Sequence, residues 1–175
     1  MGLARTFLGK LARVARHRWL DETDSARAVG PGGLQRLQSR VAAAERRHSG
    51  EIRVCVEAGL PLSYLRRDAT VRERAVAMFG KLRVWDTEHN NGVLIYLLLA
   101  EHAIEIVADR GLTKRVPQAT WGALVDGMRS AFRAGQFEQG LEQAVDAVDA
   151  LLLQHFAVAE GSVNPNELPD KPDLR

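Results

Sequence analysis

The sequence predicts an α/β protein, built as a three-layer α/β/α sandwich around a short mixed sheet that contains one antiparallel hairpin. Three runs, at residues 51–58, 93–100 and 103–108, have the length and composition of β-strands. The run at 93–100 is apolar throughout, so a strand formed by it needs cover on both faces of its sheet. Apolar residues at helical spacing occur before, between and after these runs, and such segments supply the two covering layers.

Four helices are predicted from apolar residues that recur every three or four positions, and they span residues 34–48, about 68–83, 117–134 and 137–156. In the first of them Leu37, Val41 and Ala44 fall on one face, and Gly50 follows as a stop signal. Pro117 suits the first turn of the third helix, because an N–H group at that position has no helical partner. With the amino-terminal helix described below, the order is helix, helix, strand, helix, strand, strand, helix, helix.

The second and third strands are separated only by Glu101 and His102, and so short a turn joins antiparallel neighbours. These two strands are the predicted hairpin. The first strand holds Cys55, the single cysteine of the chain, which excludes an intramolecular disulfide. In the middle of a strand a cysteine acts as a small buried apolar residue, and we expect no nucleophile there.

Residues 3–20 are predicted to form a basic amphipathic helix. Leu3, Phe7, Leu11 and Val14 recur at helical spacing, and the same stretch contains five Arg or Lys residues and no acidic one. Two interpretations remain open: the helix packs on the domain or frays as an arm, or it docks to an anionic membrane surface or an acidic partner. Basic residues interrupt the apolar ones, so the stretch lacks the continuous apolar core of a signal peptide.

The sequence divides into three parts: residues 1–33 hold the basic helix and a linker, residues 34–156 form the α/β/α domain, and residues 157–175 form a flexible acidic tail that contains prolines. Between the two ends the chain is close to neutral, which argues against nucleic-acid binding. The longest apolar run has eight residues, and a membrane-spanning helix needs roughly 20. We therefore expect a cytoplasmic protein, with peripheral contact at the inner face of the membrane as the alternative that the basic helix leaves open.

Four short motifs occur in order on the predicted elements. They are Gly50-Glu51-Ile52 at the first strand, Asn91-Gly92-Val93-Leu94-Ile95 at the second, Arg110-Gly111-Leu112 after the third, and Phe132-Arg133-Ala134-Gly135-Gln136-Phe137-Glu138-Gln139-Gly140 between the last two helices. With these motifs, residues 34–156 resemble the TPM domain family, in its compact cytosolic branch found in bacteria. Asn90 stands where the family usually has Asp, and Asp109 where it usually has Gly. The resemblance implies one of three roles, because the family has been linked to acid phosphatase activity, divalent-cation binding and the maintenance of membrane complexes.

Polar residues cluster at the two ends of the predicted hairpin. Asp86 and Glu88 precede its first strand and Asp109 follows its second, so pairing of the strands brings them to one edge of the sheet. Clustered carboxylates bind hard cations, and we predict a Ca²⁺ or Mg²⁺ site at Asp86, Glu88 and Asp109. The spacing excludes an EF-hand loop. The alternative is that Asn90-Asn91-Gly92 shapes a turn and that Asp109 pairs with Arg110 or caps a neighbouring element.

The sequence contains no motif typical of a nucleophilic hydrolase, a phosphate-binding loop or a zinc hydrolase. His48 and Ser49 are adjacent, but neighbouring residues at a helix end seldom meet as nucleophile and base, and the end of the helix accounts for Ser49 and Gly50. We therefore predict no catalytic residue. The predicted function is that of a non-catalytic accessory or interaction module with a protein partner, and this partner is membrane-associated if the basic helix docks at a membrane. The alternative is a metal-dependent phosphatase that uses the acidic edge together with Arg110.

Overall fold

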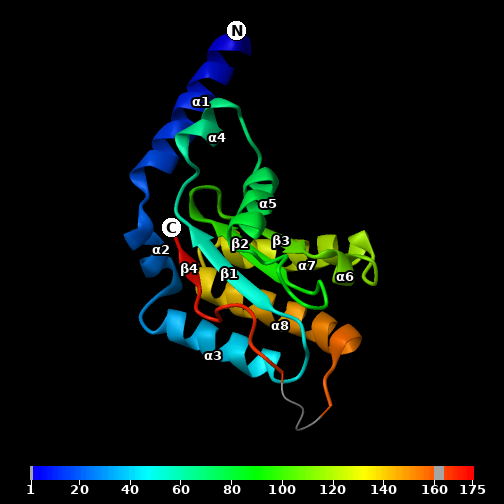
Figure 1. Cartoon of the computed structure of the whole chain (residues 1–175). Coiled ribbons are helices and arrows are strands. Elements are labelled where there is room, and N and C mark those ends of the chain that lie inside the picture. Colours follow the sequence, from blue (N-terminus) through cyan, green and yellow to red (C-terminus); the bar gives the residue numbers. More distant parts are fainter. Residues whose placement is uncertain (1, 160–163) are drawn as a thin grey trace.

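The computed structural model describes the backbone of residues 2–159 and 164–175, and within these ranges the side chains from residue 9 onward (Figure 1). Its α-helices are α1 (Gly2–Trp19), α2 (Glu22–Val29), α3 (Gly33–Glu45), α4 (Leu62–Arg66), α5 (Val71–Lys81), α6 (Arg110–Thr113), α7 (Gln118–Arg133) and α8 (Phe137–Phe156). Its strands are β1 (Ile52–Glu57), β2 (Val93–Leu98), β3 (Ala103–Ala108) and β4 (Asp173–Leu174).

The four strands form one mixed sheet in the order β3-β2-β1-β4. β1 runs parallel to β2, with Ile52 opposite Val93, and parallel to β4 on its other side, with Cys55 opposite Asp173. β2 and β3 form the antiparallel hairpin that the sequence predicts. The turn is longer than two residues, however, because a single 3-10 turn at Leu99–Glu101 precedes a left-handed residue at His102.

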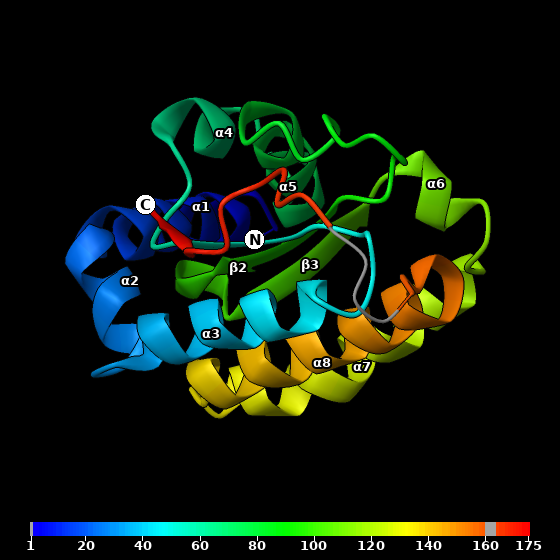
Figure 2. The ribbon, with the colours of Figure 1, turned by 60° about the horizontal axis from the view of Figure 1, so that its bottom comes forward.

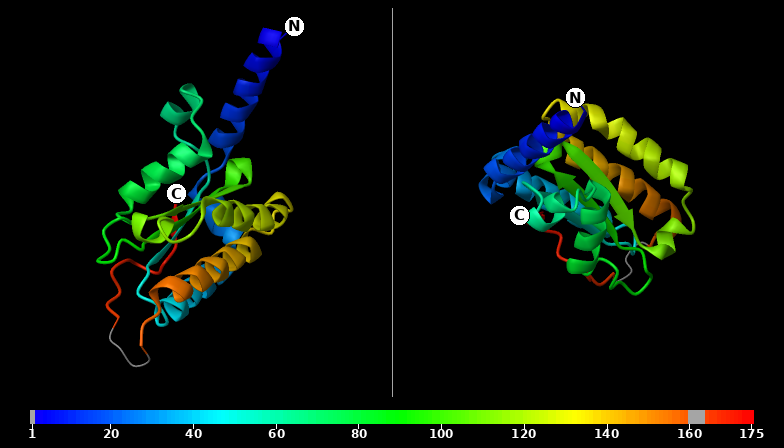
Figure 3. Two further views of the ribbon diagram at one scale, coloured as in Figure 1. Left: turned by 90° about the vertical axis from the view of Figure 1, so that its right-hand side faces the viewer. Right: turned by 90° about the horizontal axis from the view of Figure 1, so that it is seen from above.

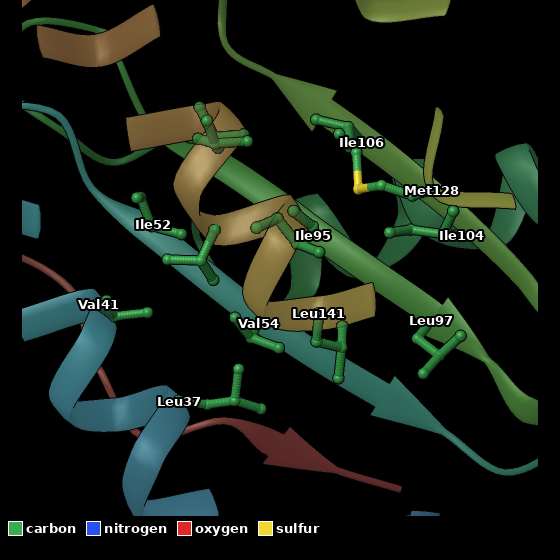
Figure 4. Packing of buried hydrophobic residues seen from close by; sticks show 14 of the residues in the cluster. Leu37, Val41, Ile52, Val54, Ile95, Leu97, Ile104, Ile106, Met128 and Leu141 are labelled. Carbon is green, nitrogen blue, oxygen red and sulfur yellow. The ribbon is translucent and has the colours of Figure 1, made fainter. Parts of the chain in front are cut away.

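The sheet has an apolar layer on each face, as the continuous apolar run of β2 requires. On one face Val54 and Ile95 belong to the larger buried cluster, which includes residues of α3, α7 and α8 (Figures 2 and 4). On the other face Cys55 and Tyr96 belong to a smaller cluster with residues of α4 and α5. The alternation of strand side chains between the two clusters confirms the predicted three-layer α/β/α sandwich.

The segment at 21–33 is more ordered than the linker predicted for it, since it contains α2. The Asp21 side chain accepts hydrogen bonds from the N–H groups of Thr23 and Asp24, and the Asp24 side chain accepts one from the N–H of Asp21. This reciprocal capping box stabilises a helix of only eight residues. The usual capping box has Ser or Thr followed three positions later by Glu or Gln, and Asp21 with Asp24 departs from it. The prediction of a linker rests instead on the Pro and Gly residues at 31–33.

Residues 164–175 lie along the free side of β1 and include β4, whereas the sequence predicts a flexible tail over 157–175 (Figure 1). The N–H of Arg175 donates to the carbonyl of Val56, and the N–H of Ala58 donates to the carbonyl of Arg175. A pairing of two residues leaves no alternation in a sequence, which explains why this strand escapes prediction. We call residues 164–175 the strap.

Candidate functional site

The structure brings the two polar ends of the hairpin together, as predicted. The N–H of Asp109 donates to the carbonyl of Gly92 at 2.9 Å, and the N–H of Gly111 donates to the carbonyl of Asn90 at 2.8 Å. The loop before β2 and the residues after β3 therefore form one surface, at which Gly111 approaches the backbone of Asn90 too closely for a side chain. We call residues 86–92 and 109–111 the polar edge.

The three carboxylates of the predicted cation site lie on the polar edge, but those of Asp86 and Asp109 have local partners. Asp86 forms an ion pair with the guanidinium of Arg83. Asp109 caps α6, because its Oδ1 accepts a hydrogen bond from the N–H of Arg110 at 2.6 Å. Glu88 is exposed, and its N–H donates to the Glu167 carboxylate at 2.9 Å. Within residues 2–159 and 164–175, no group of three or more His, Cys, Asp or Glu side chains is placed to hold a metal ion.

Two buried oxygen atoms of the polar edge have no hydrogen-bond donor among the described residues: Oδ1 of Asn91 and Oδ2 of Asp109. The amide nitrogen of Asn91 is fully engaged, since it donates to both the carbonyl and the hydroxyl of Ser49. Arg110 is held in place as well, because its Nε donates to Oδ1 of Asn90 at 2.9 Å. The edge thus offers one amide oxygen and one carboxylate oxygen to a ligand that can donate a hydrogen bond or accept lone pairs.

A cavity of about 300 Å³ lies beside the polar edge, lined by Ser49, Glu88, His89, Val158, Ala159, Asn164, Pro165 and Glu167. The hydroxyl of Ser49 takes part in binding the Asn91 amide, and the ring of His48 is buried next to Asp149 rather than beside Ser49. Burial lowers the pKa of His48, so the imidazole is neutral at physiological pH. Ser49 and His48 therefore do not form a nucleophile and base pair.

The structure reveals a pair of buried carboxyl groups that the sequence analysis did not select. Oε1 of Glu45, at the end of α3, accepts the N–H of Ile52 at 2.7 Å, and Oε2 has no hydrogen-bond partner among the described residues. Burial, followed by the charges of Glu51 and Asp170, raises the pKa of Glu45 to about 9. Burial also raises the pKa of Glu51, whose carboxylate accepts main-chain N–H groups of the strap. In the sequence, the motif Gly50-Glu51-Ile52 is the one feature that points to Glu51.

Comparison with known proteins gives the family. The family model described as TPM domain matches residues 23–151. The chain belongs to the TPM domain family. A comparison with curated proteins finds no match.

Two solved structures resemble this TPM protein. The NMR structure of the BA42 protein from the psychrophilic bacterium Bizionia argentinensis has a TM-score of 0.70 and 26% sequence identity, over 82% of this chain and 93% of that one. The N-terminal domain of a protein from P. gingivalis has a TM-score of 0.60 and 20% identity, over 81% of this chain and 95% of that domain. The second comparison supports the fold alone.

The longest motif shared with the TPM family is explained by the packing of α7 on α8. Phe132 is fully buried, and a Cβ on Gly140 would lie 2.7 Å from its ring. Gly135 adopts a positive φ of 74° where the chain turns between the two helices. The motif therefore encodes a helical hairpin and contributes no chemical group.

Helix α1 lies outside the residues that match the TPM model, and its amino-terminal half extends beyond the body of the protein (Figure 3). A clasp fixes its other half: His17 is buried, its Nδ1 accepts the N–H of Leu60, and its Nε2 lies 3.0 Å from the Glu101 carboxylate. Arg13 donates to Glu101 and to Asp68. Beyond this clasp Leu11 is 51% exposed, and Trp19 at the end of the helix is 87% exposed.

Proposed function

We propose that this TPM protein is a non-catalytic accessory module that docks at the anionic inner face of a membrane, beside a membrane-associated protein partner, through α1. The observation that carries the proposal is the projecting helix, which is basic, free of acidic residues and bound to the body of the protein through Lys10, Arg13 and His17. Leu11 supplies an exposed apolar side chain of the kind that enters the lipid headgroup region, and Trp19 suits the interface between water and lipid. Leu3, Phe7 and Arg5 of the predicted amphipathic pattern belong to the part of α1 whose side chains lie outside the described residues.

Charge also supports docking at an anionic surface. Arg16 and Arg18 are exposed, and neither makes a hydrogen bond or ion pair among the described side chains. Each basic residue near an anionic bilayer contributes about 1 kcal/mol of attraction, which salt screens. Among the described residues no helix combines the length and apolar content that crossing a bilayer demands. The proposed contact is therefore peripheral.

Co-sedimentation with vesicles tests this proposal. The full chain is expected to bind vesicles that contain anionic phosphatidylglycerol, with an affinity that falls as salt rises, and to bind neutral phosphatidylcholine vesicles weakly. The double variant Arg16→Glu, Arg18→Glu should bind anionic vesicles at least about tenfold more weakly, since four units of charge change next to the surface. Arg46→Glu with Lys114→Glu is the matched control, because these two exposed residues follow α3 and α6, which lie away from α1 (Figure 1). Equal binding by the two double variants would rule out docking through α1.

The second candidate function is divalent-cation binding at the polar edge, with the metal-dependent phosphatase as its catalytic extension. The unpartnered buried oxygens of Asn91 and Asp109 favour it, because an acceptor buried without a donor is costly unless a cation or water occupies the site. Ca²⁺ or Mg²⁺ would be held there by Asp109 and Asn91, with the exposed carboxylates of Asp86 and Glu88 adding charge, and Arg110 would attract a phosphate group.

A thermal titration separates this candidate from the first. The melting temperature of chelator-stripped protein is expected to rise saturably with Ca²⁺ or Mg²⁺, and the metal-dependent rise should vanish in Asp109→Asn. The control is Asp126→Asn on the exposed face of α7, which should keep the rise. An unchanged melting temperature at millimolar metal in the wild type removes the cation site. Phosphatase rates with metal that are equal in wild type and Arg110→Ala remove the phosphatase.

A further inference from the structure

The contacts that hold the strap differ from those of an ordinary edge strand. Only two of its residues pair with β1 in a ladder. Two charged side chains, one just before β1 and one within it, bind the main chain of residues 167–171. The Glu51 carboxylate accepts the N–H groups of Glu167 and Leu168. The Arg53 guanidinium donates to the carbonyls of Pro169 and Lys171. Hydrogen bonds to charged groups are roughly twice as strong as those between neutral groups.

The ends of the strap are bound through polar contacts as well. The Asn164 amide donates to the carbonyls of Glu45 and His48, at 2.8 and 3.0 Å. At the other end the hydroxyl of Ser25, which is fully buried, donates to the carbonyl of Arg175 at 3.0 Å. The residues of α2, the end of α3 and β1 that make these contacts therefore form one surface, which binds an extended chain along its length. We call this surface the strand groove.

The strap contributes few buried side chains of its own. Leu168 is 7% exposed and packs in the smaller core cluster, and Pro172 is the other buried residue of the strap. The strand groove, in contrast, presents Glu51 with no exposed surface and Arg53 at 8% exposure. Departure of the strap would return this carboxylate and this guanidinium to water, where both are well solvated. A few apolar side chains, here Leu168, Pro172 and the partly buried Leu174, together with a set of main-chain contacts are typical of a peptide bound by addition to a sheet edge.

We propose that the strand groove is an exchangeable binding site for an extended peptide, and that a second copy of this chain can fill it with its own strap. The second copy is the fitting partner because the groove binds main-chain atoms at fixed positions around Leu168, and every copy presents the same positions. The exchange preserves each contact and changes only the chain that supplies it. Cleft and ligand are then contributed by different molecules, as in strand exchange between identical subunits.

A labelled peptide tests the groove in the full-length protein. A fluorescein-labelled peptide with the sequence of residues 164–175 is expected to bind wild-type protein weakly, because the chain's own strap competes for the groove. Leu168→Asp in the protein removes the anchor of the resident strap, so the same peptide should bind this variant at least about tenfold more tightly. A peptide that carries Leu168→Asp serves as the control and should not bind.

A mixing experiment tests the second copy as the occupant. Arg53→Ser weakens the groove of a chain while leaving its strap intact, and Leu168→Asp does the reverse. Light scattering should show a one-to-one complex when these two variants are mixed and monomers when each is alone. Should Leu168→Asp fail to melt cooperatively, Leu168→Ala replaces it in both experiments.

Two results would overturn the proposal. A folded Leu168 variant that binds the peptide no more tightly than wild type excludes an exchangeable groove. Tight binding of the peptide together with no complex in the mixture excludes the second copy as its occupant.

Discussion

Replacing Glu45 with glutamine is expected to stabilise the protein at neutral pH and to flatten the dependence of its stability on pH. Glu45 is 7% exposed, and its pKa is raised from 4.5 to about 9, first by burial and then by Glu51 and Asp170. The folded protein therefore holds this carboxyl group in its protonated form at pH 7. In the unfolded chain the same group is exposed to water and ionised.

The sign and size of the effect follow from this difference in bound protons. The folded state binds a proton that the unfolded state lacks between pH 4.5 and about 9. The stabilising contribution is fully present below pH 4.5, falls by about 1.4 kcal/mol for each pH unit above it, and is lost as the pH rises through the folded pKa. At pH 7 the loss amounts to about 3 kcal/mol.

Glutamine removes the titration and keeps the local contact. Its amide oxygen can accept the N–H of Ile52, as Oε1 of Glu45 does, and its NH₂ group stands where the buried oxygen has no partner. The Glu45→Gln variant should therefore match the wild type near pH 4.5 and exceed it by about 1–3 kcal/mol at pH 7.

Urea unfolding at several pH values between 5 and 8 measures this difference. The free energy of unfolding of the wild type should decline over that range more steeply than that of Glu45→Gln. Glu22→Gln on the exposed side of α2 is the control, and it should follow the wild type. Parallel profiles for wild type and Glu45→Gln would refute the reasoning, because they would mean that Glu45 is ionised in the folded protein.

Two further predictions concern the core. Gly140→Ala places a Cβ 2.7 Å from the buried Phe132 ring and should lower the free energy of unfolding by about 1–3 kcal/mol. The control Gly127→Ala meets open space on α7 and should raise the free energy of unfolding by up to about 1 kcal/mol. A loss of equal size in both variants would contradict the packing argument. Burial raises the pKa of the Cys55 thiol to about 12. Iodoacetamide should therefore leave the thiol unmodified in the native protein at pH 8 and alkylate it in urea. Rapid labelling of the native protein would contradict this, because it would show that β1 is open to solvent.

Periodicity predicted the central architecture because long elements repeat their pattern several times. The stripe of α8 predicted a helix over 137–156, and the structure has it over Phe137–Phe156. The uniform burial of β2 follows from its uniform apolar sequence. The strap and α2 could not be recognised in this way, because two paired residues or two helical turns are too short to show a period.

The position of the polar edge was predictable and the directions of its side chains were not. Pairing of β2 with β3 had to bring Asp109 next to Gly92, and the register alone ensures it. Whether Asp109 faces a cation or caps α6 depends on the turn that follows, which the sequence does not specify. The carboxyl groups of Glu45 and Glu51 were missed for a related reason. The motif points to Glu51, but its contacts with the main chain of the strap and the burial of Glu45 depend on tertiary packing that has no period in the sequence.

The sheet order has a consequence for how the chain assembles. The hairpin of β2 and β3 closes over a few residues, a process of microseconds in isolated hairpins. The opposite side of β1 is completed by distant residues, such as Asp173, which lies 118 positions after Cys55 in the chain. Closing so long a loop costs more conformational entropy. During synthesis one edge of β1 therefore remains unpaired until the strap has emerged from the ribosome. In crowded polysomes this unpaired edge is the place where a nascent chain can form strand-to-strand hydrogen bonds with a neighbouring chain.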